Sequence, residues 1–146
     1  TIFLSPGPGL PPEAGIMLDL IREYGPTKNL FGICLGMQGI AMAFGGNVVN
    51  LQEVYHGVAT RMNICDKQDM IFKNVPAKFY AGRYHSWVVE KASLPPGIII
   101  TSEDEEGNIM SLRHDEYNIY GVQFHPESIM TPEGKKIIRN FLLYCT

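Results

Sequence analysis

The junction at residues 30–46 constrains the fold of this chain more than any other stretch. The apolar run Leu30–Ile33 is typical of a strand that is covered on both faces. Apolar residues at helical spacing between Met37 and Phe44 predict the buried side of a helix, which ends at the glycine pair 45–46. Between strand and helix lies Cys34, so the sequence predicts a sharp turn that carries a thiol.

We interpret Cys34 as a nucleophile, because its Gly-x-Cys-x-Gly setting is typical of a nucleophile elbow. Gly32 and Gly36 let the backbone pack closely around such a turn. The amino end of the following helix, with its unpaired N–H groups and dipole, favours the thiolate. Cys65 and Cys145 are predicted to be small buried hydrophobes, because an odd number of cysteines without Cys-x-x-Cys spacing indicates neither a disulfide framework nor a zinc site.

A similar strand and helix come first in the chain. Ile2–Leu4 predicts a strand, and proline in the first turn at Pro11 predicts a helix that runs to Tyr24. The loop Pro6-Gly7-Pro8-Gly9 between them is stiff at its prolines and offers the amides of Gly7 and Gly9 to a ligand. A plain turn is the alternative. Strand, helix, strand, helix is the pattern of a parallel α/β fold.

The remainder predicts short strands and one helix. The helix at the carboxyl end is expected to have Thr131 as its N-cap and Pro132 at its first position. The acidic run 103–107 predicts a solvated hairpin turn. Further strands are expected at 48–51, at several places within 56–89, and at 98–101, 109–112 and 119–123. We therefore predict an α/β domain over residues 1–146, with an open, mostly parallel twisted sheet flanked by helices and a small antiparallel portion.

A histidine and a carboxylate follow the last predicted strand. Pro126 disfavours the helical region for His125, so the segment is extended and the side chains of His125 and Glu127 can lie on one side. Glu127 would hold one ring nitrogen while the other faces a thiol, which is how cysteine nucleophiles are activated. Since loops at the carboxyl ends of parallel strands share one edge, we expect His125 to meet Cys34. The other histidines, His56, His85 and His114, are interpreted as structural or surface residues.

Charge and hydropathy exclude several classes of function. The net charge of −3 and the absence of basic clusters give no electrostatic reason to expect nucleic acid or an anionic membrane as a partner. No apolar run approaches the ~20 residues of a membrane-spanning helix, and the amino end has no signal-like pattern. We expect a cytoplasmic protein without a metal site.

With these motifs in this order, the sequence resembles the class I, or triad, glutamine amidotransferases over nearly its whole length. Within that family it is most similar to the glutaminase components of anthranilate synthase and aminodeoxychorismate synthase. The residues that carry the resemblance are Ser5-Pro6-Gly7-Pro8-Gly9, Pro12-Glu13-Ala14-Gly15-Ile16, Gly32-Ile33-Cys34-Leu35-Gly36-Met37-Gln38, Arg83-Tyr84-His85-Ser86 and the His125-Pro126-Glu127 segment.

The resemblance implies hydrolysis of L-glutamine through a cysteine thioester, with the ammonia passed to a separate chorismate-using synthase subunit. It implies that the present chain needs no cofactor and that the partner synthase needs Mg²⁺. Cys34, His125 and Glu127 would be the catalytic triad. The amides of Gly7 and Leu35 would form the oxyanion hole, and the glutamine-binding residues would be Gly7, Pro8, Gly9, Gln38, Ser86 and Trp87.

The chain differs from the family pattern in two ways. Trp87 stands where the family usually has leucine, and the strand, helix and strand that usually precede the proline-glycine loop are missing. We therefore expect this domain to lack its amino-terminal part. Two other functions remain open: a catalytically silent regulatory or binding subunit of the same fold, and a generic cysteine hydrolase of peptides or esters.

Overall fold

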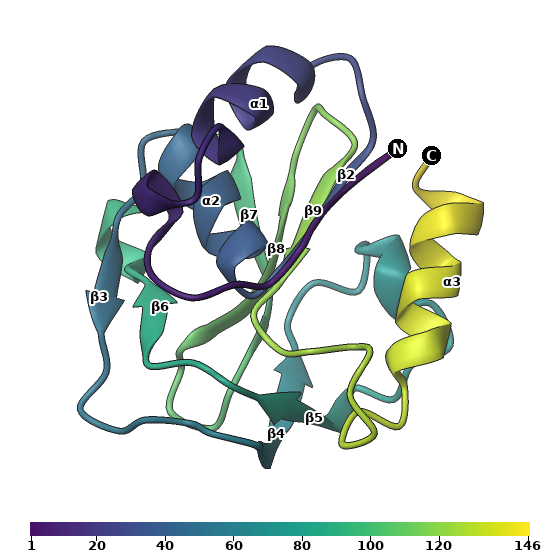
Figure 1. Ribbon diagram of the computed structural model, residues 1–146. Coiled ribbons are helices and arrows are strands. Elements are labelled where there is room, and N and C mark those ends of the chain that lie inside the picture. Colours follow the sequence, from purple (N-terminus) through teal and green to yellow (C-terminus); the bar gives the residue numbers. More distant parts are fainter.

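The computed structural model describes residues 1–146 and contains a seven-stranded sheet, a separate two-stranded sheet and three α-helices (Figure 1). The helices are α1 (Met17–Tyr24), α2 (Leu35–Ala43) and α3 (Gly134–Tyr144), with 3₁₀ turns η1 (Pro11–Glu13), η2 (Met70–Phe72) and η3 (Lys91–Ser93). The strands are β1 (Ile2–Leu4), β2 (Leu30–Ile33), β3 (Val48–Asn50), β4 (Val58–Ile64), β5 (Lys78–Arg83), β6 (Trp87–Val89), β7 (Ile98–Glu103), β8 (Ile109–His114) and β9 (Ile119–Val122).

Three neighbouring strands, β1, β2 and β9, run parallel at one side of the large sheet, whose order is β1-β2-β9-β8-β7-β4-β5. Ile33 pairs with Val122, so β2 and β9 end level with each other. The segments that follow these strands begin with the proline-glycine loop, Cys34 and Gln123, and all leave from the same edge.

The predicted α/β class with an open sheet is confirmed, but the antiparallel portion is larger than expected. The pairs β9–β8, β8–β7, β7–β4 and β4–β5 are all antiparallel, and so is β3–β6 in the small sheet. Short connections explain the antiparallel pairing of β7 with β8 and of β8 with β9, because parallel neighbours need a crossover of a dozen or more residues. The acidic run 103–107 contains the predicted turn between β7 and β8, but the turn is not fully solvated, because Asp104 is buried.

Helices cover the two faces of the sheet and create two hydrophobic cores. In Figure 1, α1 and α2 lie on one side of the strands and α3 on the other. One core joins α1 and α2 to the sheet through Ile21, Met37 and Ile40. The other joins α3 to the opposite face through Ile137 and Phe141. Because both faces are covered, the strands that carry the candidate site are held from both sides.

Two predicted helix starts are wrong. The chain from Pro11 forms a 3₁₀ turn and then breaks before α1, because Gly15 takes a left-handed φ of +62° between them. At the carboxyl end, α3 begins at Gly134 and not after Thr131. The Thr131 hydroxyl instead donates to the carbonyl of His125 at 2.6 Å and accepts from the amide of Gly82 at 3.0 Å. It is therefore a tether for the histidine segment.

Glycine at position 134 brings α3 against that same segment. A Cβ atom there would lie 1.8 Å from the carbonyl oxygen of Pro126, far inside van der Waals contact. Only glycine allows this approach. The position of the His125–Glu127 segment is thus fixed by the helix that follows it.

Candidate active site

A cavity of about 370 Å³ opens at the edge where β1 and β2 end. It is lined by Cys34 and by every residue predicted to form the oxyanion hole or to bind glutamine, namely Gly7, Pro8, Gly9, Leu35, Gln38, Ser86 and Trp87. His125 and Glu127 lie outside this lining. Leu10, Glu13, Tyr84 and His85 also line the cavity, although sequence reasoning gave them no role there.

Cys34 occupies the strained turn that its glycine neighbours predict. Its φ of 54° and ψ of −102° place it outside the regions that a residue with a Cβ atom favours, and such backbones cost about 1–3 kcal/mol. The turn is held because the Cys34 amide donates to the carbonyl of Val122 at 2.8 Å. A Cβ on Gly36 would lie 2.3 Å from the carbonyl oxygen of Leu4, so glycine lets α2 approach β1.

Burial makes the Cys34 side chain a protonated thiol. Although Cys34 is the N-cap of α2, desolvation raises the pKa of its thiol from 9.0 to about 11. Hydrogen bonds from the Leu35 amide and the Gln123 side chain lower that pKa, but they do not outweigh burial. The helix terminus was expected to favour the thiolate, but its effect does not outweigh burial. A base must remove the proton.

His125 is the base that the sequence predicts for this thiol. Its Nδ1 lies 2.8 Å from Glu127 Oε2, as the His-x-Glu spacing predicts, and its amide donates to the carbonyl of Gly82. The Tyr84 ring and the imidazole pack in a T-shaped arrangement, with the centroids 4.8 Å apart. Nε2 is buried and makes no hydrogen bond, so imidazole and thiol are not hydrogen-bonded in this state. With Nδ1–H donated to Glu127, Nε2 has the lone pair that accepts a proton.

Two glutamines link Cys34 to the cavity wall. Gln38 Nε2 donates to the backbone carbonyl of Trp87 at 3.0 Å and to Gln123 Oε1 at 3.1 Å. Gln123 Nε2 in turn approaches Cys34 Sγ at 3.5 Å. Gln38 was expected to hold glutamine; both donors of its amide are used within the protein, which leaves its oxygen for a ligand. Gln123, fully buried, was missed by sequence reasoning.

The opposite wall comes from the segment between β5 and β6. It includes His85, which was interpreted as a structural or surface residue. Its side chain is buried, and its position in the cavity lining was not predicted. The sequence did contain a signal for His85, because the run Arg83–Ser86 carries the family resemblance. Sequence reasoning assigned a glutamine-binding role only to Ser86 within that run.

Among the other cysteines, Cys145 is buried as expected, whereas Cys65 is exposed. No three His, Cys, Asp or Glu side chains are grouped to hold a metal ion, and no helix has the length and apolarity needed to cross a bilayer.

Comparisons with known proteins show which family the chain resembles in sequence. A family model described as glutamine amidotransferase class-I matches residues 1–145. The bifunctional protein TrpGD of Thermotoga maritima is 47% identical over 141 residues, which cover 97% of this chain and 24% of that protein. The aminodeoxychorismate/anthranilate synthase component 2 of Bacillus subtilis is 43% identical over 141 residues, which cover 97% of this chain and 72% of that protein.

The same likeness holds in three dimensions. A crystal structure of a candidate GMP synthase component from Thermoplasma acidophilum superposes with a TM-score of 0.85 at 28% identity, covering 98% of this chain and 71% of that one. The present chain spans only about a quarter of the Thermotoga maritima protein. Since the family model matches nearly end to end, the chain belongs to the class I glutamine amidotransferase family.

Proposed function

We propose that this chain hydrolyses the side-chain amide of L-glutamine to L-glutamate and ammonia, and delivers the ammonia to a synthase subunit that acts on chorismate. One observation carries the proposal: a cavity lined by the Pro-Gly-Pro-Gly loop and Gln38 has Cys34 in its wall. Support for the partner comes from relatives named as anthranilate and aminodeoxychorismate synthase components.

Cys34 and His125 would divide the reaction into two steps. Cys34 Sγ attacks the amide carbon while its proton passes to His125 Nε2, which forms the carbon–sulfur bond of a tetrahedral adduct. The carbon–nitrogen bond then breaks as His125 returns the proton to the nitrogen, which releases ammonia and leaves a γ-glutamyl thioester. His125 next takes a proton from water, whose oxygen attacks the thioester carbon, and the carbon–sulfur bond breaks to give glutamate and the thiol.

The remaining residues would orient and stabilise these species. Glu127 would keep His125 in the Nδ1–H tautomer. Because the Glu127 side chain is 57% exposed, we propose that it orients the imidazole and has no large electrostatic effect. The amides of Gly7 and Leu35 would bind the oxyanion, each contributing about 3 kcal/mol in comparable enzymes. The reaction needs no cofactor in this chain, and we expect Mg²⁺ to be a requirement of the partner synthase.

Glutamine-dependent ammonia release tests the proposal. The complete natural protein, purified together with any synthase that accompanies it, should produce equal amounts of glutamate and ammonia. Cys34→Ser should abolish this production, and Cys65→Ser, which changes an exposed thiol, should not. No ammonia with the synthase present would support the silent subunit instead. Turnover of unrelated amides or esters without a synthase would support the generic hydrolase.

A further inference from the structure

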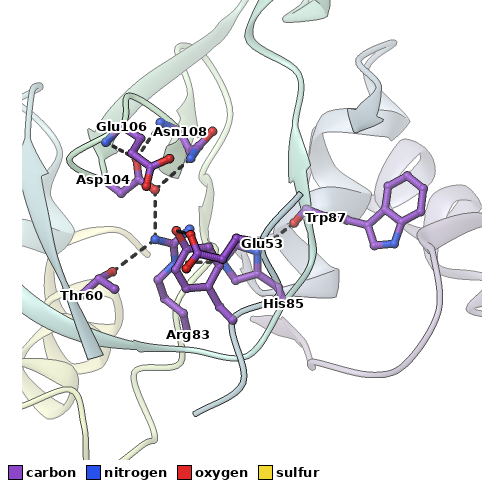
Figure 2. A network of polar contacts seen from close by, with 9 residues as sticks. Glu53, Thr60, Arg83, His85, Trp87, Asp104, Glu106 and Asn108 are labelled. Atoms are coloured by element: carbon purple, nitrogen blue, oxygen red, sulfur yellow. Dashed lines mark hydrogen bonds and ion pairs between the residues drawn. The ribbon is translucent and has the colours of Figure 1, made fainter. Parts of the chain in front are cut away.

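His85 connects a buried ion pair to the wall of the cavity (Figure 2). Arg83 Nη1 lies 3.0 Å from Asp104 Oδ2, and both side chains are at most 3% exposed. Arg83 Nε donates to His85 Nε2 at 3.1 Å. On the other side of the ring, His85 Nδ1 lies 2.9 Å from the backbone carbonyl of Trp87. In Figure 2 that carbonyl faces His85, whereas the indole of Trp87 extends away from the network.

These contacts fix the tautomer of His85. A guanidinium only donates hydrogen bonds, so His85 Nε2 must be the acceptor and carries no proton. Nδ1 therefore bears the hydrogen and donates it to Trp87. Burial, and then the charge of Arg83, lower the pKa of His85 to about 4. The charge of His125 also lowers this pKa, whereas the charge of Asp104 raises it. His85 is accordingly neutral, with one hydrogen in a fixed direction.

The surroundings hold the ion pair in turn. Asp104 accepts from the side chain of Asn108 at 3.0 Å and from the amide of Glu106 at 3.0 Å. The Tyr55 ring stacks on His85 with the centroids 5.6 Å apart, and Arg83 lies over the same Tyr55 ring at 3.5 Å. This rigid support is outside the cavity lining apart from His85 itself. At the cavity, this support acts through one hydrogen bond, from His85 Nδ1 to the Trp87 carbonyl.

That carbonyl belongs to the wall that would bind glutamine. Trp87 O accepts from both His85 and Gln38, and Gln38 leads through Gln123 to Cys34. A shift of the Ser86–Trp87 backbone would change the shape of the glutamine pocket. Because such a wall contacts the substrate equally in the ground state and the transition state, its displacement weakens binding more than chemistry.

We propose that His85 is a positioning residue for glutamine binding: held by Arg83 and Asp104, it donates Nδ1–H to the Trp87 carbonyl and so fixes the Ser86–Trp87 wall. The inference rests on the proposed glutaminase function. It assigns to the Arg83-Tyr84-His85-Ser86 run a role beyond the backbone contact at Ser86.

Two amide substitutions separate the two hydrogen bonds of His85. In His85→Asn the side-chain nitrogen takes the place of Nδ1 and keeps the donor to Trp87, but the acceptor for Arg83 is lost. In His85→Gln the terminal group reaches the place of Nε2 and keeps the acceptor, but the donor to Trp87 is lost. We expect His85→Gln to raise the KM for glutamine about three- to tenfold with kcat nearly unchanged, as for loss of one hydrogen bond. His85→Asn, which keeps the donor to Trp87 and loses only the hold of Arg83, should raise the KM about two- to threefold.

A second variant and a direct binding measurement also test the positioning role of His85. Asp104→Asn, outside the cavity, should raise KM about two- to threefold, and it tests the proposal if His85→Gln does not fold. Calorimetric binding of L-glutamine to Cys34→Ser proteins should reproduce the KM order without turnover. Equal KM values in His85→Gln and wild type, or the same rise in both amide variants, would overturn the positioning role. If wild type itself neither binds nor hydrolyses glutamine, the proposed function fails instead.

Discussion

Alkylation of Cys34 as a function of pH would test how its thiol is activated. The structure has the thiol buried, with a pKa of about 11, and no hydrogen bond to His125. The perturbation is His125→Asn, made in a background where Cys65→Ser and Cys145→Ala leave Cys34 as the single thiol. Asparagine at position 125 keeps a polar side chain of similar size at Nδ1 but cannot accept a proton at Nε2.

The expected rates follow from the pKa. At pH 7.5 a thiol of pKa 9.0 is about 3% thiolate, and one of pKa 11 is about 0.03%, a hundredfold less. Thiolate nucleophilicity rises with pKa with a Brønsted slope of about 0.4–0.5, which recovers roughly tenfold. Cys34 should therefore react with iodoacetamide roughly tenfold more slowly than an ordinary cysteine. Its rate should increase about tenfold per pH unit through pH 10 without levelling off.

His125→Asn should leave this alkylation profile unchanged and reduce glutamine turnover by at least about a hundredfold, the loss typical of a missing general base. The reason is that, in the proposed mechanism, proton transfer to His125 occurs only during attack on the substrate. Alkylation is followed by mass spectrometry of the quenched protein. A plateau between pH 6 and 8 that disappears in His125→Asn would refute the reasoning, because it would mean that a thiolate–imidazolium pair exists before substrate binds.

Three further predictions concern the scaffold and its titration. Gly36→Ala places a Cβ 2.3 Å from the carbonyl oxygen of Leu4, and should lower the free energy of unfolding by about 1–3 kcal/mol in urea denaturation. Gly134→Ala meets the Pro126 carbonyl oxygen at 1.8 Å, so turnover should fall along with the melting temperature; full activity would contradict the coupling of α3 to the histidine segment. Burial raises the pKa of Asp69 from 3.8 to about 6, so the folded protein retains a proton that the unfolded chain loses, and stability falls as pH rises through this range. Between pH 5 and 7 the loss from this group is ~1.3 kcal/mol, and Asp69→Asn should remove that dependence in urea titrations at the two pH values.

Local residue chemistry alone determined the chemical parts of the site and their order in the chain. Gly-x-Cys-x-Gly predicts the strained turn at Cys34, because only small neighbours tolerate such close packing. Pro126 predicts an extended backbone at His125, where the chain pairs with Gly82, because proline restricts the residue before it. The rest of the predicted extended segment is instead a turn, closed by the Ser128 amide on the His125 carbonyl. These are short-range steric rules, so they act wherever the segment lies. The alternation of strands and helices likewise predicts the α/β class.

Only the tertiary structure decided the electrostatic state of the site and the support behind it. The pKa of Cys34 depends on how much water reaches the sulfur, and burial by residues distant in the sequence outweighs the helix terminus that the sequence reveals. Gly134, which looks like a defect at a helix start, is needed because the Pro126 carbonyl lies against it. His85 gains its tautomer from Arg83 and Asp104, and Asp104 approaches only when β5 and the turn after β7 come together. Such contacts join residues whose separation along the chain carries no local signal, so the fold alone creates them.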